Sequence, residues 1–396
     1  MAQPSSLAND LPKTRAAPGT PLYVHLPFCA AKCHYCDFFS VAAEGHDRGA
    51  LLDALLEEAR RFAPQAPRTV FFGGGTPSLL EGPELVRLLE TLESLCGWRA
   101  SAREITLECN PESLDRDKAR LLRELGVNRL SIGFQSLDLS TLQLFGRVHD
   151  VEQSFAAFEA ARSAGFDNLN LDLIYAIPGQ DLERWERDLT RILALEPEHV
   201  SAYNLTFEEE TLFRKWMEEG LLKPLPEERE LAFFWRTRER LAQAGIDAYE
   251  ISNFSRSGRE CLHNLNYWHN GEYLGIGPSA VSKIGARRLA NVKGIQGYAR
   301  KLAENPDALV FGEEPGPLDR LAETWWLGLR LQRGLTPAEA LARAGAPAGF
   351  EDPTREVVAR LLGQGLLEEG GGRLRLSQAG LPLADFVARQ FLALAG

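Results

Sequence analysis

The stretch from Pro21 to Ser40, PLYVHLPFCAAKCHYCDFFS, decides how the whole chain is interpreted. It holds Cys29, Cys33 and Cys36 in the spacing C-x3-C-x2-C, directly after an apolar run, Leu22 to Leu26, that predicts a strand. Most iron–sulfur clusters that carry electrons are held by four cysteines. Three thiolates on one short loop leave one iron of a cubane cluster without a protein ligand. The spacing therefore predicts a cluster whose open iron can bind a substrate or a cofactor.

Two other uses of the three cysteines must be weighed. A zinc site usually needs four ligands arranged in pairs, and His25 or His34 could supply the fourth, so zinc stays open as an alternative. Disulfides are disfavoured, because six cysteines in 396 residues is sparse and we expect no secretory segment before them. We therefore expect reduced thiols in a cytoplasmic protein.

Composition sets outer limits on the fold and on the partners. With 396 residues, 44% of them hydrophobic and 25% charged, the chain can form one large globular domain and a smaller one. It has no run of about 18 apolar residues, so no transmembrane segment is expected. The formal net charge of −11 argues against nucleic acid as a partner, because phosphate binding needs clustered Lys and Arg.

Strand-like and helix-like segments alternate through the first half of the chain, which favours an α/β fold with parallel strands. Residues that could bind a ligand or act in catalysis follow each strand, and barrel folds build their sites at these strand ends. Six units are too few for a closed eight-stranded barrel, so we predict a partial, open (β/α)6 barrel. The predicted strands are 22–26, 68–72, 105–108, 128–134, 168–176 and 199–205, and the predicted helices are 47–61, 83–95, 113–125, 154–164 and 181–195.

The rest of the chain divides into a tail, a connector and a C-terminal module. Residues 1–20 are expected to form a flexible tail and residues 21–255 the barrel, with two helices over 208–243 and an antiparallel edge strand over 247–253. Residues 256–315 are expected to form the barrel edge and connector, which contains the segment HNLNYW at residues 263–268. Residues 316–396 predict a small, mainly helical, winged-helix-like domain with one β-hairpin, serving either as a structural cap or as a partner-binding module.

Three consecutive glycines, Gly73 to Gly75, follow the second predicted strand and precede Thr76 and Pro77. Glycine lets the backbone take up positive φ and approach a ligand closely. A simple strand-to-helix turn is the alternative, but it does not need three glycines in a row. Placed one unit after the cysteine loop, the GGGTP segment predicts contact with a ligand on the open iron.

At this point the motifs resemble a known family. YVHLPFC with its two further cysteines, FFGGGTPS, LECNP, GFQS and DLIYAIPGQ, in this order from Leu22 to Ser282, resemble the oxygen-independent coproporphyrinogen III oxidase group of radical S-adenosylmethionine (SAM) proteins. The resemblance implies that Cys29, Cys33 and Cys36 hold a [4Fe–4S] cluster and that SAM chelates the open iron.

The resemblance also implies roles for other residues. Tyr23, Gly74 and Glu108 match positions that contact the cluster-bound SAM. A second SAM site or substrate region is matched by Tyr35, Gly75, Thr76, Gln135, Arg147, Asp172 and Thr206. Ordinary hydrogen bonding at a strand end is the alternative for Gln135, Arg147 or Asp172 taken singly. Their placement on consecutive strand ends favours the site.

Departures from the oxidase pattern point to one branch of this group. Phe38 stands where the oxidases carry a fourth cysteine, and the stretch before the cysteine loop is shorter. CDFFS together with HNLNYW resembles instead the heme-chaperone, HemW-type branch. That resemblance implies heme as cargo, heme-requiring client proteins and a reductant for the cluster.

Heme binding raises the question of an iron ligand. His263 is the candidate, because neutral imidazole is a common axial ligand of heme. The alternative is that HNLNYW is a buried, hydrogen-bonded turn that locks the barrel to its edge strand. Cys261 is a rival ligand, whereas Cys96 and Cys109 look structural. The function predicted is that of a heme chaperone, with a true coproporphyrinogen oxidase, an enzyme in porphyrin biosynthesis, and a radical SAM enzyme on another substrate as alternatives.

Overall fold

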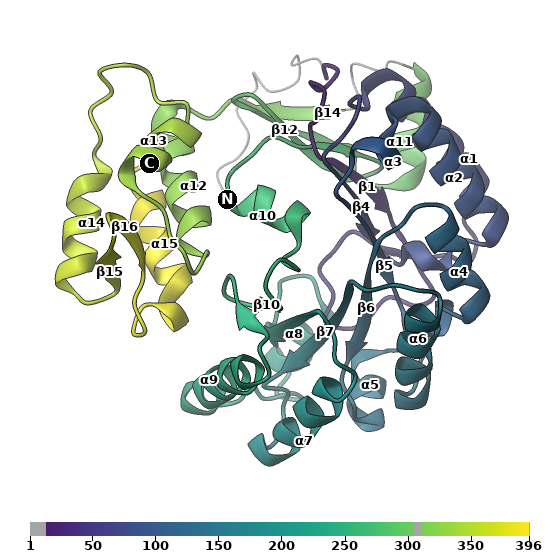
Figure 1. Cartoon of the computed structure of the whole chain (residues 1–396), viewed down its shortest axis with the longest axis horizontal. Coiled ribbons are helices and arrows are strands. Elements are labelled where there is room, and N and C mark those ends of the chain that lie inside the picture. Colours follow the sequence, from purple (N-terminus) through teal and green to yellow (C-terminus); the bar gives the residue numbers. More distant parts are fainter. Residues whose placement is uncertain (1–12, 305–309, 396) are drawn as a thin grey trace.

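The computed structural model describes residues 13–304 and 310–395 and contains one large sheet that curves into an open barrel (Figure 1). The sheet has nine strands in the order β11-β1-β4-β5-β6-β7-β8-β10-β9. Their bounds are β1 Leu22–Leu26, β4 Thr69–Gly74, β5 Glu104–Cys109, β6 Arg129–Gln135, β7 Leu169–Tyr175, β8 His199–Asn204, β9 Asp247–Ala248, β10 Asn253–Ser255 and β11 Leu274–Ile276.

Strands β1 and β4 to β8 are the six predicted ones, and each pairs in parallel with the next. The partial (β/α)6 barrel is therefore confirmed. At one edge β10 pairs antiparallel with β8 and β9 pairs antiparallel with β10, so the single edge strand expected over 247–253 is instead two short strands, 247–248 and 253–255. At the other edge β11 pairs in parallel with β1, which the sequence did not predict.

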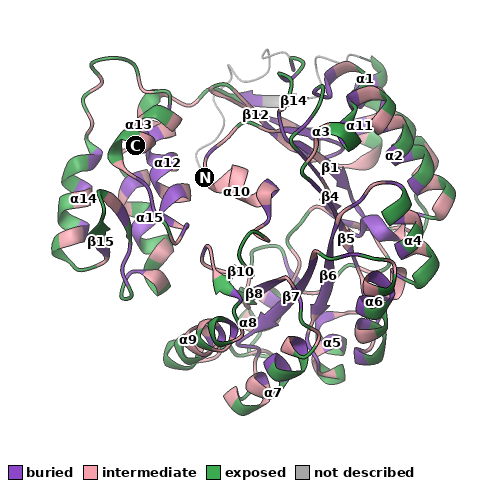
Figure 2. Cartoon of the chain, viewed as in Figure 1, coloured by how far each residue is buried: buried purple, intermediate pink, exposed green. Residues whose placement is uncertain are grey.

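Helices cover the outer face of this sheet, and their outward sides are exposed (Figure 2). The helices of this part of the chain are α1 Arg48–Phe62, α2 Gly82–Cys96, α3 Trp98–Ser101, α4 Arg116–Glu124, α5 Leu139–Phe145, α6 Val151–Ser163, α7 Leu182–Leu193, α8 Leu212–Glu218, α9 Glu227–Gln243, α10 Leu262–Trp268 and α11 Ile295–Glu304. Two of them do not lie on the outer face: α8 contacts the cysteine loop, and α10 lies inside the opening of the barrel, at the start of β4 (Figure 1). Residues 208–243 thus form the two helices predicted, α8 and α9. Smaller sheets are made by β2 Phe28–Cys29 with β3 Val41–Ala42, and by β12 Val281–Ile284, β13 Arg287–Asn291 and β14 Val310–Glu313.

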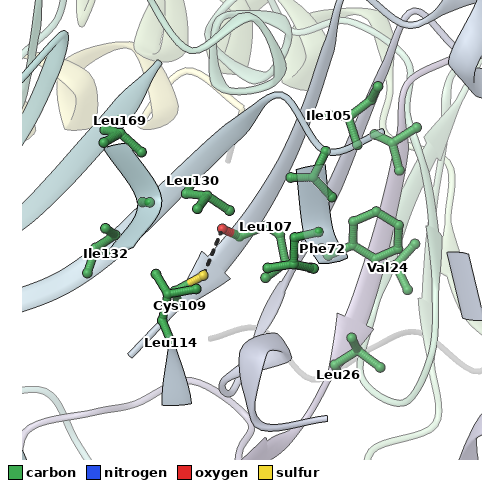
Figure 3. Packing of buried hydrophobic residues seen from close by; sticks show 14 of the residues in the cluster. Val24, Leu26, Phe72, Ile105, Leu107, Cys109, Leu114, Leu130, Ile132 and Leu169 are labelled. Atoms are coloured by element: carbon green, nitrogen blue, oxygen red, sulfur yellow. Dashed lines mark hydrogen bonds between the residues drawn. The ribbon is translucent and has the colours of Figure 1, made fainter. Parts of the chain in front are cut away.

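The barrel strands alternate between apolar and polar residues, and this alternation decides where the site lies. Successive side chains of a strand point to opposite faces of the sheet. In β6, Leu130, Ile132 and Phe134 are fully buried and join the main hydrophobic core, part of which Figure 3 shows. The residues between them, Ser131 to Gln135 at every second position, line the barrel interior. The sequence therefore builds an apolar wall under the helices and a polar interior.

Residues 13–20 are held against the barrel, whereas a flexible tail was predicted for residues 1–20. Residues 1–12 lie outside the described residues. The Lys13 ammonium is fully buried and donates to the Glu58 carboxylate on α1 at 2.5 Å and to the Gly275 carbonyl at 2.8 Å. Glu58 also accepts hydrogen bonds from the Gly277 amide and from Tyr298 of α11. This buried ion pair, together with backbone hydrogen bonds from Ala16 to Phe62 and from Gly19 to Gln65, holds the segment against the barrel.

The C-terminal part of the chain forms a separate lobe with its own hydrophobic core (Figure 1). Its elements are α12 Pro317–Leu329, α13 Pro337–Arg343, α14 Thr354–Gly363, β15 Leu367–Gly370, β16 Arg373–Leu376 and α15 Ala384–Leu392. Trp325 stacks on Phe391 at the centre of this core, with ring centroids 5.3 Å apart. The mainly helical domain with one hairpin matches the fold predicted for residues 316–396. No helix in the described part of the chain combines the length and hydropathy that a bilayer crossing demands.

Candidate cluster and cofactor site

The cysteine loop lies against the carboxyl ends of the barrel strands and is fixed by backbone hydrogen bonds. The Cys29 carbonyl accepts from the Ala43 amide at 2.9 Å, next to the β2–β3 pair. The His34 amide donates to the Phe145 carbonyl at the end of α5, and the His34 carbonyl accepts from the Phe213 amide of α8. The loop is thereby tied to three parts of the barrel before any ligand binds.

The three glycines allow the end of β4 to pass directly beneath this loop. A Cβ on Gly75 would lie 2.6 Å from the Phe28 carbonyl oxygen, which no side chain tolerates. Gly74 has a φ of +116°, and a Cβ there would lie 2.6 Å from the His25 ring. The His25 Nε2 bonds to the Phe39 carbonyl at 2.9 Å. Part of the glycine requirement is thus the close fit between strand and loop, in addition to any ligand contact.

A cavity of about 1550 Å³ opens at this end of the barrel and extends to the C-terminal lobe. Cys29, Cys33 and Cys36 all line it, and all three are free thiols. The cavity also brings together most of the other predicted site residues, namely Tyr35, Gly74, Gly75, Thr76, Glu108, Gln135, Arg147, Asp172 and Thr206. Residues from the loop and from the ends of β4 to β8 therefore converge on one space.

Arg147 connects the cysteine loop to the barrel. Its Nη1 donates to the Cys33 sulfur at 3.5 Å, and its Nη2 donates to the Asn110 side-chain oxygen at 2.8 Å and to the Gly133 carbonyl at 3.0 Å. Gln135, nearby, ends β6 at an irregular register and has a φ of +63°, a strained backbone for a residue other than glycine. Strained backbone of this kind is common at ligand sites, and it persists only where the surrounding fold holds it in place.

Glu108 is a buried carboxyl group at the end of β5, and its Oε2 accepts from the Gly74 amide at 3.1 Å. Burial raises the pKa of Glu108 to about 8, and the carboxylate of Asp172 adds to this rise, while the Gly74 amide and Arg129 oppose it. Without a cationic ligand, Glu108 is therefore protonated at neutral pH. A ligand that brings an ammonium group to this carboxyl favours its ionised form.

The zinc alternative finds no support in the nearby imidazoles. Both nitrogens of His25 are engaged, Nδ1 with the Tyr23 hydroxyl at 2.9 Å and Nε2 with the Phe39 carbonyl. The Nδ1 of His34 bonds to the Leu144 carbonyl at 2.9 Å. His25 thus has no ring nitrogen left for zinc, and neither His25 nor His34 lines the cavity that the three cysteines share.

Two predicted residues, Tyr23 and His263, do not line the cavity. The Tyr23 hydroxyl bonds to His25 Nδ1, and burial and Glu108 raise the pKa of Tyr23. His263 is 1% exposed and belongs to α10. Its Nδ1 bonds to the Thr69 hydroxyl at 2.8 Å and its Nε2 to the Tyr267 hydroxyl at 2.9 Å, and burial lowers its pKa to about 3. The geometry supports the alternative that HNLNYW is a buried, hydrogen-bonded element rather than a heme ligand.

The donor set and the space fit a cubane cluster with one open iron. The three thiols line one cavity, and burial raises the pKa of Cys29 and that of Cys36, the latter to about 11, so the loop alone does not favour their thiolate forms. The cavity exceeds the roughly 300–1,000 Å³ of ordinary ligand pockets, which leaves room for a cofactor beside the cluster. A partial parallel barrel with this three-cysteine loop at its carboxyl edge defines the radical SAM class.

Comparisons with known proteins agree with this class. A family model described as the radical SAM superfamily matches residues 23–192, and one described as the HemN C-terminal domain matches residues 317–383. The heme chaperone HemW of Bacillus subtilis strain 168 is 34% identical over 93% of this chain and 98% of its own. The HemW of Mycobacterium tuberculosis H37Rv is 37% identical over 97% of this chain and 98% of its own.

A solved structure, that of coproporphyrinogen III oxidase (HemN) from Escherichia coli, superposes with a TM-score of 0.81 at 25% identity and covers 96% of this chain and 91% of its own. The chain belongs to the HemW family of radical SAM proteins. The superfamily implies a [4Fe–4S] cluster and SAM as cofactors.

Several residues that shape the site escaped sequence reasoning. Asn110 donates to the Thr76 hydroxyl and accepts from Arg147, so it joins two site residues. Asn170 and His199 form a buried polar layer beneath Asp172. The signal that could have found this layer is the polar residue at every second position of β5 to β8, which a half-buried strand with an inward polar face requires.

Proposed function

We propose that this chain binds a [4Fe–4S] cluster through Cys29, Cys33 and Cys36, binds SAM on the open iron, and carries heme as cargo to heme-requiring client proteins. Support comes from the three free thiols on one cavity wall and from the names of the curated relatives. The partners proposed are heme, its clients and a reductant for the cluster. When bound and reduced, such a cluster supplies one-electron cleavage of SAM.

The charge of the cavity wall favours this function over that of the oxidase. Two arginines, Arg147 and Arg330, face a larger set of carboxyl groups: Asp37, Glu108, Asp172, Glu208, Glu227, Glu230, Glu368 and Asp385. SAM carries a sulfonium and an ammonium against one carboxylate, and suits this wall. Coproporphyrinogen carries four carboxylates, which this wall repels. Heme carries two carboxylates, and as cargo it need not enter the cavity.

The chain's own residues have separable tasks around the cofactor. The glycines beneath the loop keep side chains out of the space next to the cluster. Glu108 and Asp172 present carboxyl oxygens to the cationic and hydroxyl groups of SAM, and Arg147 holds Cys33 in place. Phe38, which is 68% exposed and lines the cavity where the oxidases carry a cysteine, adds an apolar wall without a ligand.

Glu108 makes SAM binding depend on pH. Because its pKa is raised to about 8, it must lose a proton before it can accept hydrogen bonds from the SAM amino group as a carboxylate. We expect the affinity for SAM to rise from pH 6 to pH 8, by up to about tenfold per pH unit, and to level off above that. Titrations of cluster-loaded protein at several pH values measure this.

Glu108→Gln should reduce the slope, to which the α-amino group of SAM also contributes, while the cluster stays bound. The groups that affect the pKa of Glu108 besides burial, namely Asp172, Arg129 and the Gly74 amide, are unchanged in that variant. A slope of the same size in Glu108→Gln would show that another group titrates.

The experiment that separates chaperone from oxidase is a parallel titration of anaerobic, cluster-loaded protein with heme and with coproporphyrinogen. Saturable heme binding without conversion of coproporphyrinogen supports the proposal. Conversion without stable heme binding contradicts it and supports the oxidase.

His263→Ala in the same titration tests the heme ligand. Because both imidazole nitrogens are engaged inside the protein, we expect the variant to bind heme like the wild type. It should lose about 1–3 kcal/mol of unfolding free energy, because Thr69 and Tyr267 lose their partner. Loss of heme binding at unchanged stability would instead make His263 the ligand.

A further inference from the structure

A series of buried hydrogen bonds runs through the barrel interior from helix α10 to the cavity. The Cys261 amide, at the N-terminal end of α10, donates to the Tyr249 hydroxyl at 3.4 Å. That hydroxyl contacts His199 Nε2 at 2.9 Å, and His199 Nδ1 contacts the Asn170 side-chain oxygen at 2.6 Å. The Asn170 amide nitrogen then donates to Asp172 Oδ1 at 2.8 Å. Asp172 lines the cavity.

The polarity of this series follows from its two ends. The Asn170 Nδ2 faces the carboxylate of Asp172 and the Ser131 hydroxyl, so its Oδ1 must accept from His199. His199 is neutral, because burial and Arg129 lower its pKa well below the usual value, and its proton therefore sits on Nδ1. Nε2 then accepts from Tyr249, whose oxygen accepts from the Cys261 amide. Every donor points toward Asp172.

Ser131 completes the arrangement at the cavity end. Its hydroxyl donates to Asp172 Oδ2 at 2.9 Å, so both carboxylate oxygens are held from behind. At the far end, Glu104 accepts from the amides of Leu262 and His263, which ties the start of α10 to the start of β5. The Tyr249 carbonyl accepts from the Gln332 amide of the C-terminal lobe at 3.0 Å. The series is thus anchored at both of its ends.

We propose that Tyr249, His199 and Asn170 are positioning residues that hold the Asp172 carboxylate in orientation for SAM. This inference rests on the proposed function, in which SAM occupies the cavity. None of the three lines the cavity, so they act only through Asp172. The proposal also gives a role to the HNLNYW helix: its N-terminal end fixes the start of the series, far from the cysteine loop along the barrel axis.

The chain contains a matched control for this series. Like Tyr249, Tyr267 bonds to the Nε2 of a buried histidine at 2.9 Å. Its partner is His263, and both residues of this pair belong to α10. The His263 pair ends at Thr69 and does not lead to Asp172. Tyr249→Phe and Tyr267→Phe therefore remove the same chemical group from equivalent hydrogen bonds, and only the first breaks the series.

The test measures SAM affinity, iron content and melting temperature of both variants as cluster-loaded protein. We expect Tyr249→Phe to weaken SAM binding roughly three- to tenfold, the effect of one hydrogen bond, and Tyr267→Phe to leave it unchanged, with similar melting temperatures. His199→Gln should weaken binding by a similar factor. In the Asp172→Asn background Tyr249→Phe should have no further effect, because residues in one network are not additive.

Equal SAM affinities for Tyr249→Phe and Tyr267→Phe would overturn the positioning role and leave the proposed function intact. A wild type that binds iron but no SAM would overturn the proposed function itself. Loss of iron in Tyr249→Phe counts against the proposal, because the series does not touch the cysteine loop.

Discussion

Cys33→Ala, prepared without oxygen and reconstituted with iron and sulfide, should retain almost no iron and no brown chromophore, whereas the wild type should hold about four irons per chain. Cys29→Ala and Cys36→Ala should behave alike, because in the proposed site each thiol is the sole protein ligand of one iron. Iron and sulfide analysis beside the absorption spectrum checks this. Because the loop is fixed to β3, α5 and α8 by backbone hydrogen bonds, the variants should fold without the cluster.

Cys96→Ala is the matched control for the loop variants. Cys96 is a buried, free cysteine at the end of α2 and belongs to the hydrophobic core. Its loss should lower stability slightly and leave the iron content unchanged. Full iron content in Cys33→Ala, or a loss of iron in Cys96→Ala equal to that of the loop variants, would contradict the three-thiol site.

Glu58→Gln should lower the free energy of unfolding by about 3–5 kcal/mol, because it leaves the Lys13 ammonium buried without a counter-charge. The same substitution disturbs the hydrogen bonds to the Gly277 amide and to Tyr298, which hold the edge of the barrel next to β11. Denaturant unfolding of the variant measures the effect.

Glu57→Gln serves as the control, since Glu57 is the neighbour of Glu58 on α1 and pairs with Arg60 at the surface. An exposed pair contributes at most about 1 kcal/mol. If the two variants unfolded at the same denaturant concentration, residues 13–20 would not be held as the structure shows.

Local patterns were enough to predict much of the barrel. Each of the six parallel strands carries enough apolar residues to be seen alone, and each is followed by a helix with a clear apolar face. Strand β11 was missed because it has three residues and pairs with β1 from about 250 positions away, a partner that no local pattern reveals. Lys13 was missed because a single buried ion pair carries no periodic signal.

The residues of the site also differ in how far the sequence predicts them. The cysteines follow from their spacing. The residues at strand ends follow from the family resemblance, and they lie together because parallel strands bring their carboxyl ends to one edge. Asn170, His199 and Tyr249 follow from neither, since each looks like an ordinary polar residue until the strands are assembled. For His263 the two kinds of neighbour point in different directions: its neighbours in sequence suggest a heme ligand, whereas Thr69 and Tyr267, its neighbours in space, engage both of its nitrogens.

The most direct measurement is electron paramagnetic resonance of the reduced, cluster-loaded protein before and after addition of SAM. If the cluster has one iron without a protein ligand, its spectrum should change when SAM binds, and the change should saturate with SAM concentration. A spectrum of a reduced cluster that SAM leaves unaltered, or protein with no cluster at all, would contradict the account.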